Sequence, residues 1–429
     1  MSNKILETIE KDTVLISVEN VYKAKLRLKT VVQHTPLMHN LNWSEKYECN
    51  VFFKREDLQV VRSYKIRGAY NKMCQLSKAI LNKGIVCASA GNHAQGVAFA
   101  CRKMGVKGTI FMPSTTPQQK TMKVEFFGRD NVKVILTGDT YDASYQAAMA
   151  YSEAHDTTFI HPFDDESVIE GQATVGLEIL EDCDVPIDYI FVAIGGGGLS
   201  AGLGSFFKQV SPKTKIIGVE ATGSASMYES LKQGKVVELA KIDNFVDGVA
   251  VKRVGDKTFK ICQKVIDDII LVPEGKVCTT ILALYNEEAI VAEPAGAITI
   301  SALDFYKDKI KGKNVVVVIS GGNNDITRTE EIKERSLLYE GLKHYFIIKF
   351  PQRPGSLREF LNNVLGETDD ISHFEYVKKH ARSSGPALVG IEFKEHKDSI
   401  PFMERLNATG IEYESLNDDP MLYGFLIRP

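Results

Sequence analysis

One lysine has the setting of a group that does covalent chemistry. Lys65 lies in the run Ser-Tyr-Lys-Ile-Arg-Gly-Ala at residues 63–69, shortly after an apolar run at residues 51–53. Where a strand end leads into a helix start, an amine can be held rigidly, and burial and nearby positive charge can lower its pKa. Such a lysine can condense with an aldehyde. Lys65 is therefore our first candidate catalytic residue.

A run of four glycines is the second candidate. It follows the apolar run at residues 189–194 and precedes a helical pattern at residues 199–209. Without Cβ atoms, backbone N–H groups at a helix N-terminus can close on a phosphate. The glycine run could bind either a monophosphate or a dinucleotide. The second is possible because Gly196, Gly198 and Ala201 also fit a dinucleotide fingerprint, with Glu220 as the ribose-binding acid. The glycines that would contact a phosphate are Gly195, Gly196, Gly197 and Gly198.

A third group lies between an apolar run at residues 85–88 and a helical pattern at residues 94–104. It offers a hydroxyl, backbone N–H groups and an amide, which could bind a substrate carboxylate and an aromatic hydroxyl. A histidine in such a place is more often structural than catalytic, so we assign His93 no proton transfer. The candidate substrate-binding residues are Ser89, Ala90, Gly91, Asn92 and His93.

Apolar runs and helical patterns alternate through most of the chain, as in β-α-β units of a parallel sheet. We expect an α/β fold with two lobes, the smaller at about residues 60–160. With 429 residues, 44% of them hydrophobic, the chain is long enough for more than one domain. Seven scattered cysteines without a C-x-x-C pair indicate reduced, mostly buried thiols.

Charge and hydropathy indicate a small-molecule partner. The net charge of −3 gives no electrostatic reason to expect nucleic acid or an anionic membrane. The first residues lack an uninterrupted apolar stretch, and the strongest apolar run, at residues 315–319, is too short to span a bilayer. We therefore expect a cytoplasmic protein.

The pattern changes after about residue 329. A charged helical stretch at residues 330–342 reads as a connector between a catalytic part at residues 1–329 and a second domain at residues 343–429. We expect strands at residues 344–350, 371–378, 387–394, 411–416 and 422–427, with helices at residues 355–365 and 399–407. This order is the α+β ferredoxin-like arrangement with one additional strand.

Four motifs together resemble a known family in order and spacing. They are residues 63–69, residues 89–96, the run from Gly195 to Leu199, and Ser-Gly-Gly-Asn at residues 320–323. The chain resembles the fold type II pyridoxal-phosphate enzymes, whose two lobes are like those of tryptophan synthase β. Within them it is similar to the biosynthetic threonine dehydratases, also called threonine ammonia-lyases. The C-terminal part resembles one copy of their ACT-like regulatory domain.

The resemblance implies roles at the matching positions. Lys65 would bind pyridoxal 5'-phosphate covalently and remove the substrate's Cα proton, and Asn92 would contact the ring hydroxyl. The glycine run and Leu199 would hold the phosphate, and Glu293 would line the cofactor site, although it could equally be a helix-start residue before a proline. Ser320 would face the ring nitrogen, where a neutral hydroxyl favours elimination. Serine racemases have a second acid six residues beyond the position of Glu220, but Ser226 stands there, so we expect a monovalent ion or none at this place instead of a divalent ion.

The implied reaction is the elimination of water from L-threonine, giving 2-oxobutanoate and ammonia for isoleucine biosynthesis. L-serine is a possible second substrate, and a broader or catabolic serine and threonine dehydratase is the alternative. Isoleucine, with valine opposing it, would bind at a loop containing Arg353, Gly355, Ser356 and Leu357. We expect a homo-oligomer, a tetramer or a dimer. Two other classes stay open, a nicotinamide-dependent dehydrogenase and a non-catalytic amino-acid sensor.

Overall fold

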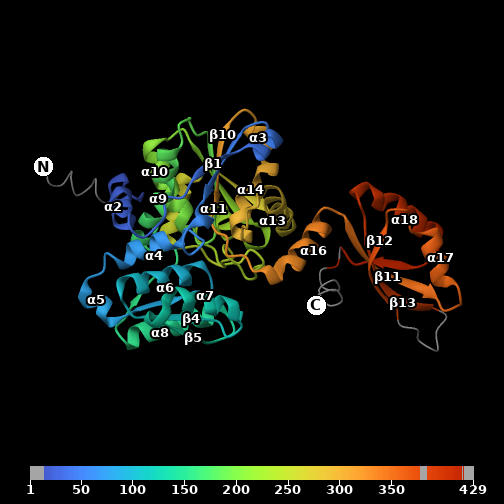
Figure 1. Ribbon diagram of the computed structural model, residues 1–429, viewed down its shortest axis with the longest axis horizontal. Coiled ribbons are helices and arrows are strands. Elements are labelled where there is room, and N and C mark those ends of the chain that lie inside the picture. The colour runs from blue at the N-terminus through green and yellow to red at the C-terminus, as the bar shows by residue number, and fades with distance from the viewer. Residues whose placement is uncertain (1–13, 377–383, 418, 420–429) are drawn as a thin grey trace. The chain divides into compact units, whose positions relative to one another are not determined.

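The computed structural model describes residues 14–376, 384–417 and 419. Their contacts divide the chain into two compact units, one up to Asp325 and one from Ile326 onward. The two units are described separately (Figure 1).

The first unit contains a smaller, entirely parallel sheet in the order β5-β4-β3-β6. All four residues of β3 are buried, as expected for a central strand that is covered on both faces. The strands are β3 (Ile85–Ala88), β4 (Gly108–Met112), β5 (Val132–Leu136) and β6 (Thr158–Phe159). The helices of this lobe are α4 (Lys65–Met73), α5 (Lys78–Lys83), α6 (Asn92–Met104), α7 (Gln118–Gly128) and α8 (Tyr141–Ala154).

The larger sheet of the same unit has the order β1-β2-β10-β7-β8-β9 and is parallel except for the edge strand β1. Its strands are β1 (Leu37–Asn40), β2 (Asn50–Arg55), β7 (Tyr189–Ala193), β8 (Lys215–Ala221), β9 (Asp268–Val272) and β10 (Asn314–Ile319). The other α-helices of the first unit are α2 (Val18–Leu28), α3 (Leu41–Tyr47), α9 (Glu166–Asp182), α10 (Gly198–Val210), α11 (Ser226–Gln233), α12 (Asp256–Val265), α13 (Glu274–Glu288), α14 (Pro294–Ser301) and α15 (Lys307–Ile310). The expected α/β class with parallel sheets is confirmed.

A buried ion network anchors the first turn of α4. The Arg67 guanidinium donates to both carboxylate oxygens of Glu56 and both of Glu178, at 2.7–2.8 Å. Lys54 adds a second cation, 2.8 Å from Glu178. Burial alone would raise the pKa of Glu178, but Arg67 and Lys54 outweigh it and lower that pKa. Two cations thus balance two carboxylates directly behind the turn that carries Lys65.

The second unit forms an antiparallel sheet in the order β12-β13-β11-β14. With a helix after the first strand and another after the third, this is the expected ferredoxin-like arrangement. The elements are α16 (Thr329–Tyr339), β11 (Lys343–Pro351), α17 (Ser356–Asn363), β12 (Asp370–Tyr376), β13 (Ser384–Glu392), α18 (Ser399–Ala408) and β14 (Tyr413–Ser415). The strand expected at residues 422–427 lies outside the described residues.

Helix α16, which the sequence suggests as a connector, packs against this second sheet. Ile332 is 1% exposed, and Glu334 accepts from Lys343 and from the Tyr345 hydroxyl, each at 2.7 Å. The helix is therefore part of the folded second unit.

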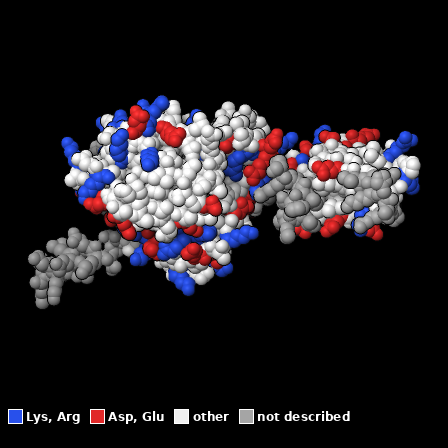
Figure 2. Space-filling view, turned by 90° about the horizontal axis from the view of Figure 1, so that it is seen from below, with Lys and Arg blue, Asp and Glu red and all other residues white. Residues whose placement is uncertain are grey.

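Charges of both signs are interspersed at the surface. In the view of Figure 2, acidic and basic side chains alternate around a centre of uncharged residues on the first unit. Among the described residues, no helix is both long and apolar enough to cross a membrane.

Candidate active site

The candidate site lies where the carboxyl ends of both parallel sheets meet. Lys65 is the first residue of α4, and the loop before it is fixed to the end of β10: the Tyr64 N–H donates to the Ser320 carbonyl at 3.2 Å, and Ser63 forms a bridge with Gly321. The Lys65 Nζ donates to the Pro162 carbonyl at 3.0 Å. Burial lowers the pKa of Lys65 to about 8, although the nearby Glu293 opposes the shift. A neutral amine is thus accessible close to neutral pH.

The glycine run forms the turn between β7 and α10. A Cβ on Gly196 would lie 2.2 Å from the Phe163 ring, and Gly197 has φ +92°, so neither position accommodates another side chain without strain. Gly197 is also the N-cap of α10, and no side chain caps this helix end. The first N–H groups of α10 are therefore left for a ligand, which fits a phosphate.

Asn92 and Glu293 come from different lobes and contact each other in the site. Asn92 opens α6, and its Nδ2 donates to Glu293 Oε1 at 2.6 Å. Asn323, from the run after β10, donates to Asn92 Oδ1 at 2.7 Å. Glu293 is also the N-cap residue before Pro294, but its side chain forms no capping bond. The backbone of Glu293 thus has the helix-start role, and its carboxylate is directed to Asn92 instead of capping the helix.

The Glu293 carboxylate is buried beside the Lys65 amine. Burial raises the pKa of Glu293 to about 7, with Asp247 adding to the shift and the Asn92 hydrogen bond opposing it. Above that pH, Glu293 is mostly an anion close to Lys65.

The other candidate residues lie at the same edge. Ser320 directly follows β10 and donates from Oγ to the Ala295 carbonyl at 3.0 Å. Ser89 follows β3, and its hydroxyl accepts from the Gly91 N–H at 3.2 Å. His93 is buried with its Nε2 at 2.8 Å from the Ile160 carbonyl, so this nitrogen carries the proton. Burial and the nearby Lys65 lower the pKa of His93 to about 3, so the ring stays neutral.

The Glu220 carboxylate is engaged by backbone N–H groups of its own lobe. Its two oxygens accept from the N–H groups of Met227 at 2.9 Å and Tyr228 at 2.7 Å, at the start of α11. The side chain is fully buried, and burial raises its pKa to about 8. The acid that a dinucleotide site would offer to the ribose is therefore already used at the start of α11, which disfavours the dinucleotide interpretation of the glycine run. The described residues contain no group of three or more His, Cys, Asp or Glu side chains arranged for a metal ion.

Sequence reasoning missed the segment after β6 that joins the lysine to the glycine run. Pro162 accepts from Lys65, Phe163 packs over Gly196, and Asp164 accepts from N–H groups at the start of α12. Nothing in these residue types predicts a binding role, because the contacts arise only when β6 is placed beside β3.

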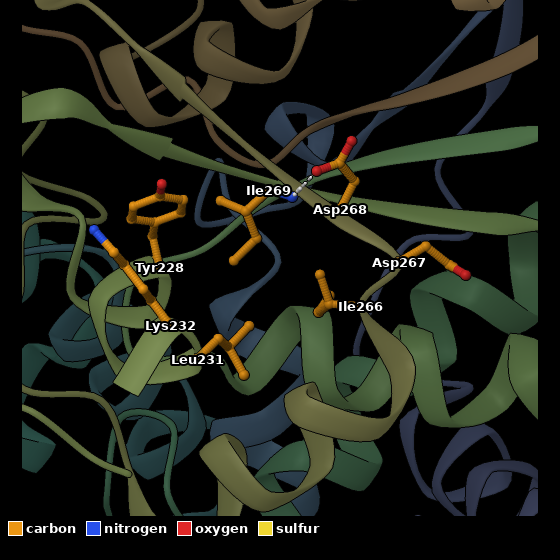
Figure 3. A pocket seen from close by; sticks show the side chains of 7 residues that line it. All are labelled: Tyr228, Leu231, Lys232, Ile266, Asp267, Asp268 and Ile269. Atoms are coloured by element: carbon orange, nitrogen blue, oxygen red, sulfur yellow. Dashed lines mark hydrogen bonds between the residues drawn. The ribbon is translucent and has the colours of Figure 1, made fainter. Parts of the chain in front are cut away.

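A hollow between α11 and β9 contributes nothing to this site (Figure 3). It lies at the amino end of β9, whereas the candidate residues lie at the carboxyl ends of the strands. Its Asp267 already accepts from Lys208 at 2.6 Å and from the Ile216 N–H at 2.8 Å. The lining residues are Tyr228, Leu231, Lys232, Ile266, Asp267, Asp268 and Ile269.

In the second unit, the loop expected to bind an effector joins β11 to α17. Gly355 has φ +89°, Ser356 is buried and Leu357 is 41% exposed. Arg353 is at the surface and forms a two-point ion pair with Glu359, at 2.7 and 2.6 Å. An effector carboxylate would have to compete with Glu359 for this guanidinium.

Comparisons with known proteins identify the family of the chain. Residues 28–321 match the family model described as pyridoxal-phosphate dependent enzyme, and residues 334–426 match the C-terminal regulatory domain of threonine dehydratase. The L-threonine dehydratase biosynthetic IlvA of Halalkalibacterium halodurans is 59% identical over 96% of this chain and 99% of its own length. The chain belongs to the biosynthetic threonine dehydratases. The protein of the same name from Bacillus subtilis is 58% identical over 98% of this chain and 100% of its own.

A solved relative supports the same family. Threonine deaminase isoform 2 from Solanum lycopersicum, in its processed form, superposes with a TM-score of 0.70 at 40% identity. The match covers 75% of this chain and 95% of the tomato chain. Pyridoxal phosphate is the cofactor of this enzyme family.

Proposed function

We propose that this protein eliminates water from L-threonine and releases 2-oxobutanoate and ammonia, as the first step of isoleucine biosynthesis. One observation carries the proposal: the Lys65 amine, with its pKa lowered to about 8, lies in one site with an uncapped glycine turn and with Ser320. When bound, pyridoxal phosphate supplies an aldehyde that condenses with amines and a ring that withdraws electrons from the substrate's Cα.

The residues that would hold the cofactor surround Lys65. Lys65 would bind it covalently through Nζ, and Asn92 would donate to or accept from the ring hydroxyl. Glu293 would line the ring's edge, and Ser320 would face the ring nitrogen. The N–H groups that would bind the phosphate are those of Gly195, Gly196, Gly197, Gly198 and Leu199.

The substrate carboxylate would bind at the start of α6. There the Ser89 hydroxyl and the backbone N–H groups of residues 90–93 follow a buried strand end. The Nε2 of His93 is occupied by the Ile160 carbonyl, so in this proposal His93 contributes its backbone N–H to the carboxylate. A bound carboxylate would orient the Cα–H bond toward the Lys65 Nζ, whose neutral form removes the proton.

Ser320 would direct the reaction toward elimination. Its hydroxyl carries no negative charge, so it cannot keep the ring nitrogen protonated as a carboxylate would. To donate to that nitrogen, the hydroxyl would exchange its hydrogen bond to the Ala295 carbonyl for one to the ring. A less electron-withdrawing ring favours prompt loss of the β-hydroxyl over side reactions at Cα.

The second unit would regulate this activity. The loop at Arg353, Gly355, Ser356 and Leu357 would bind isoleucine as inhibitor, with valine opposing it. We further propose that the protein is a cytoplasmic homo-oligomer, either a tetramer or a dimer.

The deciding experiment measures keto-acid release from L-threonine and L-serine, with and without isoleucine. We expect 2-oxobutanoate from threonine, slower pyruvate release from serine, and inhibition by isoleucine. Equal turnover of both substrates without an isoleucine response would instead support a broader dehydratase. A protein that produces no keto acid from either substrate, while binding pyridoxal phosphate, would overturn the proposed reaction.

A further inference from the structure

The carbonyl of Gly196 is fixed by a side chain that no motif singles out. Thr258, the third residue of α12, donates from Oγ1 to this carbonyl at 2.6 Å. Both residues are buried, and the Thr258 side chain is 0% exposed. A hydroxyl inside the protein that donates to a glycine carbonyl restricts the rotation of the adjoining peptide groups, whose N–H groups are those offered to a phosphate.

Thr258 is in turn held by an acid from the segment that joins β6 to α9. Asp164 Oδ1 accepts from the N–H groups of Thr258 at 3.0 Å and Lys257 at 2.9 Å, and Oδ2 accepts from Asp256 at 3.1 Å. One carboxylate thus binds three consecutive N–H groups at the start of α12. Replacing it would free the turn on which Thr258 stands.

The same short segment also contacts the catalytic lysine. Pro162, two residues before Asp164, accepts from Lys65 Nζ, and the Phe163 ring covers Gly196. The segment at residues 162–164 therefore contacts Lys65, the glycine run and α12 at once. This arrangement sets the separation between the amine and the phosphate-binding N–H groups.

We propose that Thr258 and Asp164 are positioning residues that hold the glycine run in its phosphate-binding conformation. The inference rests on the proposed function, in which this run binds the cofactor phosphate. Glycines lose more conformational entropy on ordering than other residues, so a free run would weaken phosphate binding. A run ordered in advance by Thr258 avoids that loss at the moment of binding.

The test titrates apoenzyme with pyridoxal phosphate and, separately, with pyridoxal, which lacks the phosphate, and follows the absorbance of the lysine adduct. Thr258→Val keeps the side-chain shape but removes the hydroxyl, and Thr258→Ser keeps the hydroxyl. We expect Thr258→Val to weaken pyridoxal phosphate binding about five- to tenfold, the effect of one hydrogen bond, without a comparable change for pyridoxal. Thr258→Ser should retain most of the preference for the phosphorylated form.

Thr280→Val is the matched control, because the buried Thr280 hydroxyl donates to the Lys276 carbonyl within its own helix, at 3.1 Å. Its preference for pyridoxal phosphate over pyridoxal should not change. The melting temperature of each apoenzyme is measured alongside. A Thr258→Val protein that melts earlier but keeps the full preference would overturn the proposal and leave Thr258 a purely structural residue.

Two further variants separate this inference from the proposed function. Gly196→Ala places a methyl group against the Phe163 ring and should abolish the phosphate preference if the glycine run binds phosphate. If Gly196→Ala keeps the preference, the phosphate site itself is misassigned. If Gly196→Ala loses it and Thr258→Val does not, only the positioning role fails. Asp164→Asn, which loses one acceptor, covers the case in which Thr258→Val does not fold, and it should lower the same preference.

Discussion

The Asn92 amide nitrogen donates to Glu293 Oε1 at 2.6 Å, and this bond joins the two lobes of the first unit. Asn92 starts the helix after β3 of the smaller sheet, whereas Glu293 precedes α14, which packs on the larger sheet. Since the carboxylate can only accept and Asn323 donates to the other end of the amide, both polar groups of Asn92 have a defined partner. The orientation of this amide is therefore set by the large lobe.

Glu293→Gln should change the pH at which Lys65 binds its cofactor. The neutral amine is needed, so attachment should rise roughly tenfold per pH unit below a pKa of about 8 and level off above it. The Glu293 anion raises the pKa of Lys65, so the neutral glutamine should lower that pKa and move the midpoint to more acidic pH. Glutamine can still accept from Asn92. The absorbance of the lysine adduct, measured over a range of pH after apoenzyme is mixed with pyridoxal phosphate, gives the midpoint. A midpoint of Glu293→Gln at the same or higher pH than the parent would contradict the electrostatic effect of Glu293 on Lys65.

Lys65→Ala should abolish the imine absorbance and turnover without unfolding the protein. Burial depresses the pKa of Lys65, which means that folding disfavours its charged form. This destabilising contribution is fully present below pH 8 and diminishes as the pH rises from about 8 toward 10.5. Below pH 8 the apoenzyme of the variant should therefore melt no earlier than the parent apoenzyme. Persistent keto-acid release by the variant would show that another group performs the chemistry.

Ser320→Asp should slow elimination and increase side reactions at Cα. An aspartate facing the ring nitrogen would favour its protonation and make the ring more strongly electron-withdrawing. The buried site already contains Glu293, so the new carboxylate also faces a like charge, and cofactor affinity should fall. Transamination and racemisation products, quantified against 2-oxobutanoate, give the readout. Clean elimination at the parental rate would exclude this role for Ser320.

Arg67→Met should destabilise the apoenzyme strongly. The guanidinium is fully buried between Glu56 and Glu178, so its removal leaves two carboxylates with one remaining cation, Lys54. Breaking a buried pair in this way costs about 3–5 kcal/mol. Equilibrium urea unfolding of the apoenzyme measures the change. The exposed pair Arg353 and Glu359 provides a control, because solvent screens this ion pair and Arg353→Met should leave the free energy of unfolding nearly unchanged.

A chain that ends at Asp325 should keep threonine turnover and lose its response to isoleucine. All candidate catalytic residues lie in the first unit, and an effector on the second unit acts only through different affinities for two states of the enzyme. Ending at Tyr339 instead would leave α16 without β11 and expose Ile332, so that protein should aggregate more readily. Isoleucine titrations of the full chain and of the chain that ends at Asp325, with the oligomeric state of each measured alongside, test this. Equal inhibition of the full and shortened chains would place the effector site in the first unit.

The sequence by itself determined the elements and most of the chemistry. Apolar runs of four to six residues can be recognised in the sequence where a strand is buried on both faces: the run at residues 85–88 is β3, and the run at residues 315–319 lies in β10. The glycine run could be placed at a helix start because only local backbone geometry is involved. The lysine and its motif indicated the family because the reaction requires an amine at that position.

Only the tertiary structure decided which groups meet. An acid at the end of β8 reads as a ligand-binding residue, yet Glu220 turns toward the N–H groups of α11, a choice that depends on where α11 packs. Thr258 donates a hydrogen bond to Gly196, 62 positions away in the sequence, and Asn92 donates one to Glu293, 201 positions away. Such contacts follow from the order of strands within sheets and the docking of one lobe on the other. Residue types and spacing predict local hydrogen bonding and periodicity, but they do not encode these distances directly.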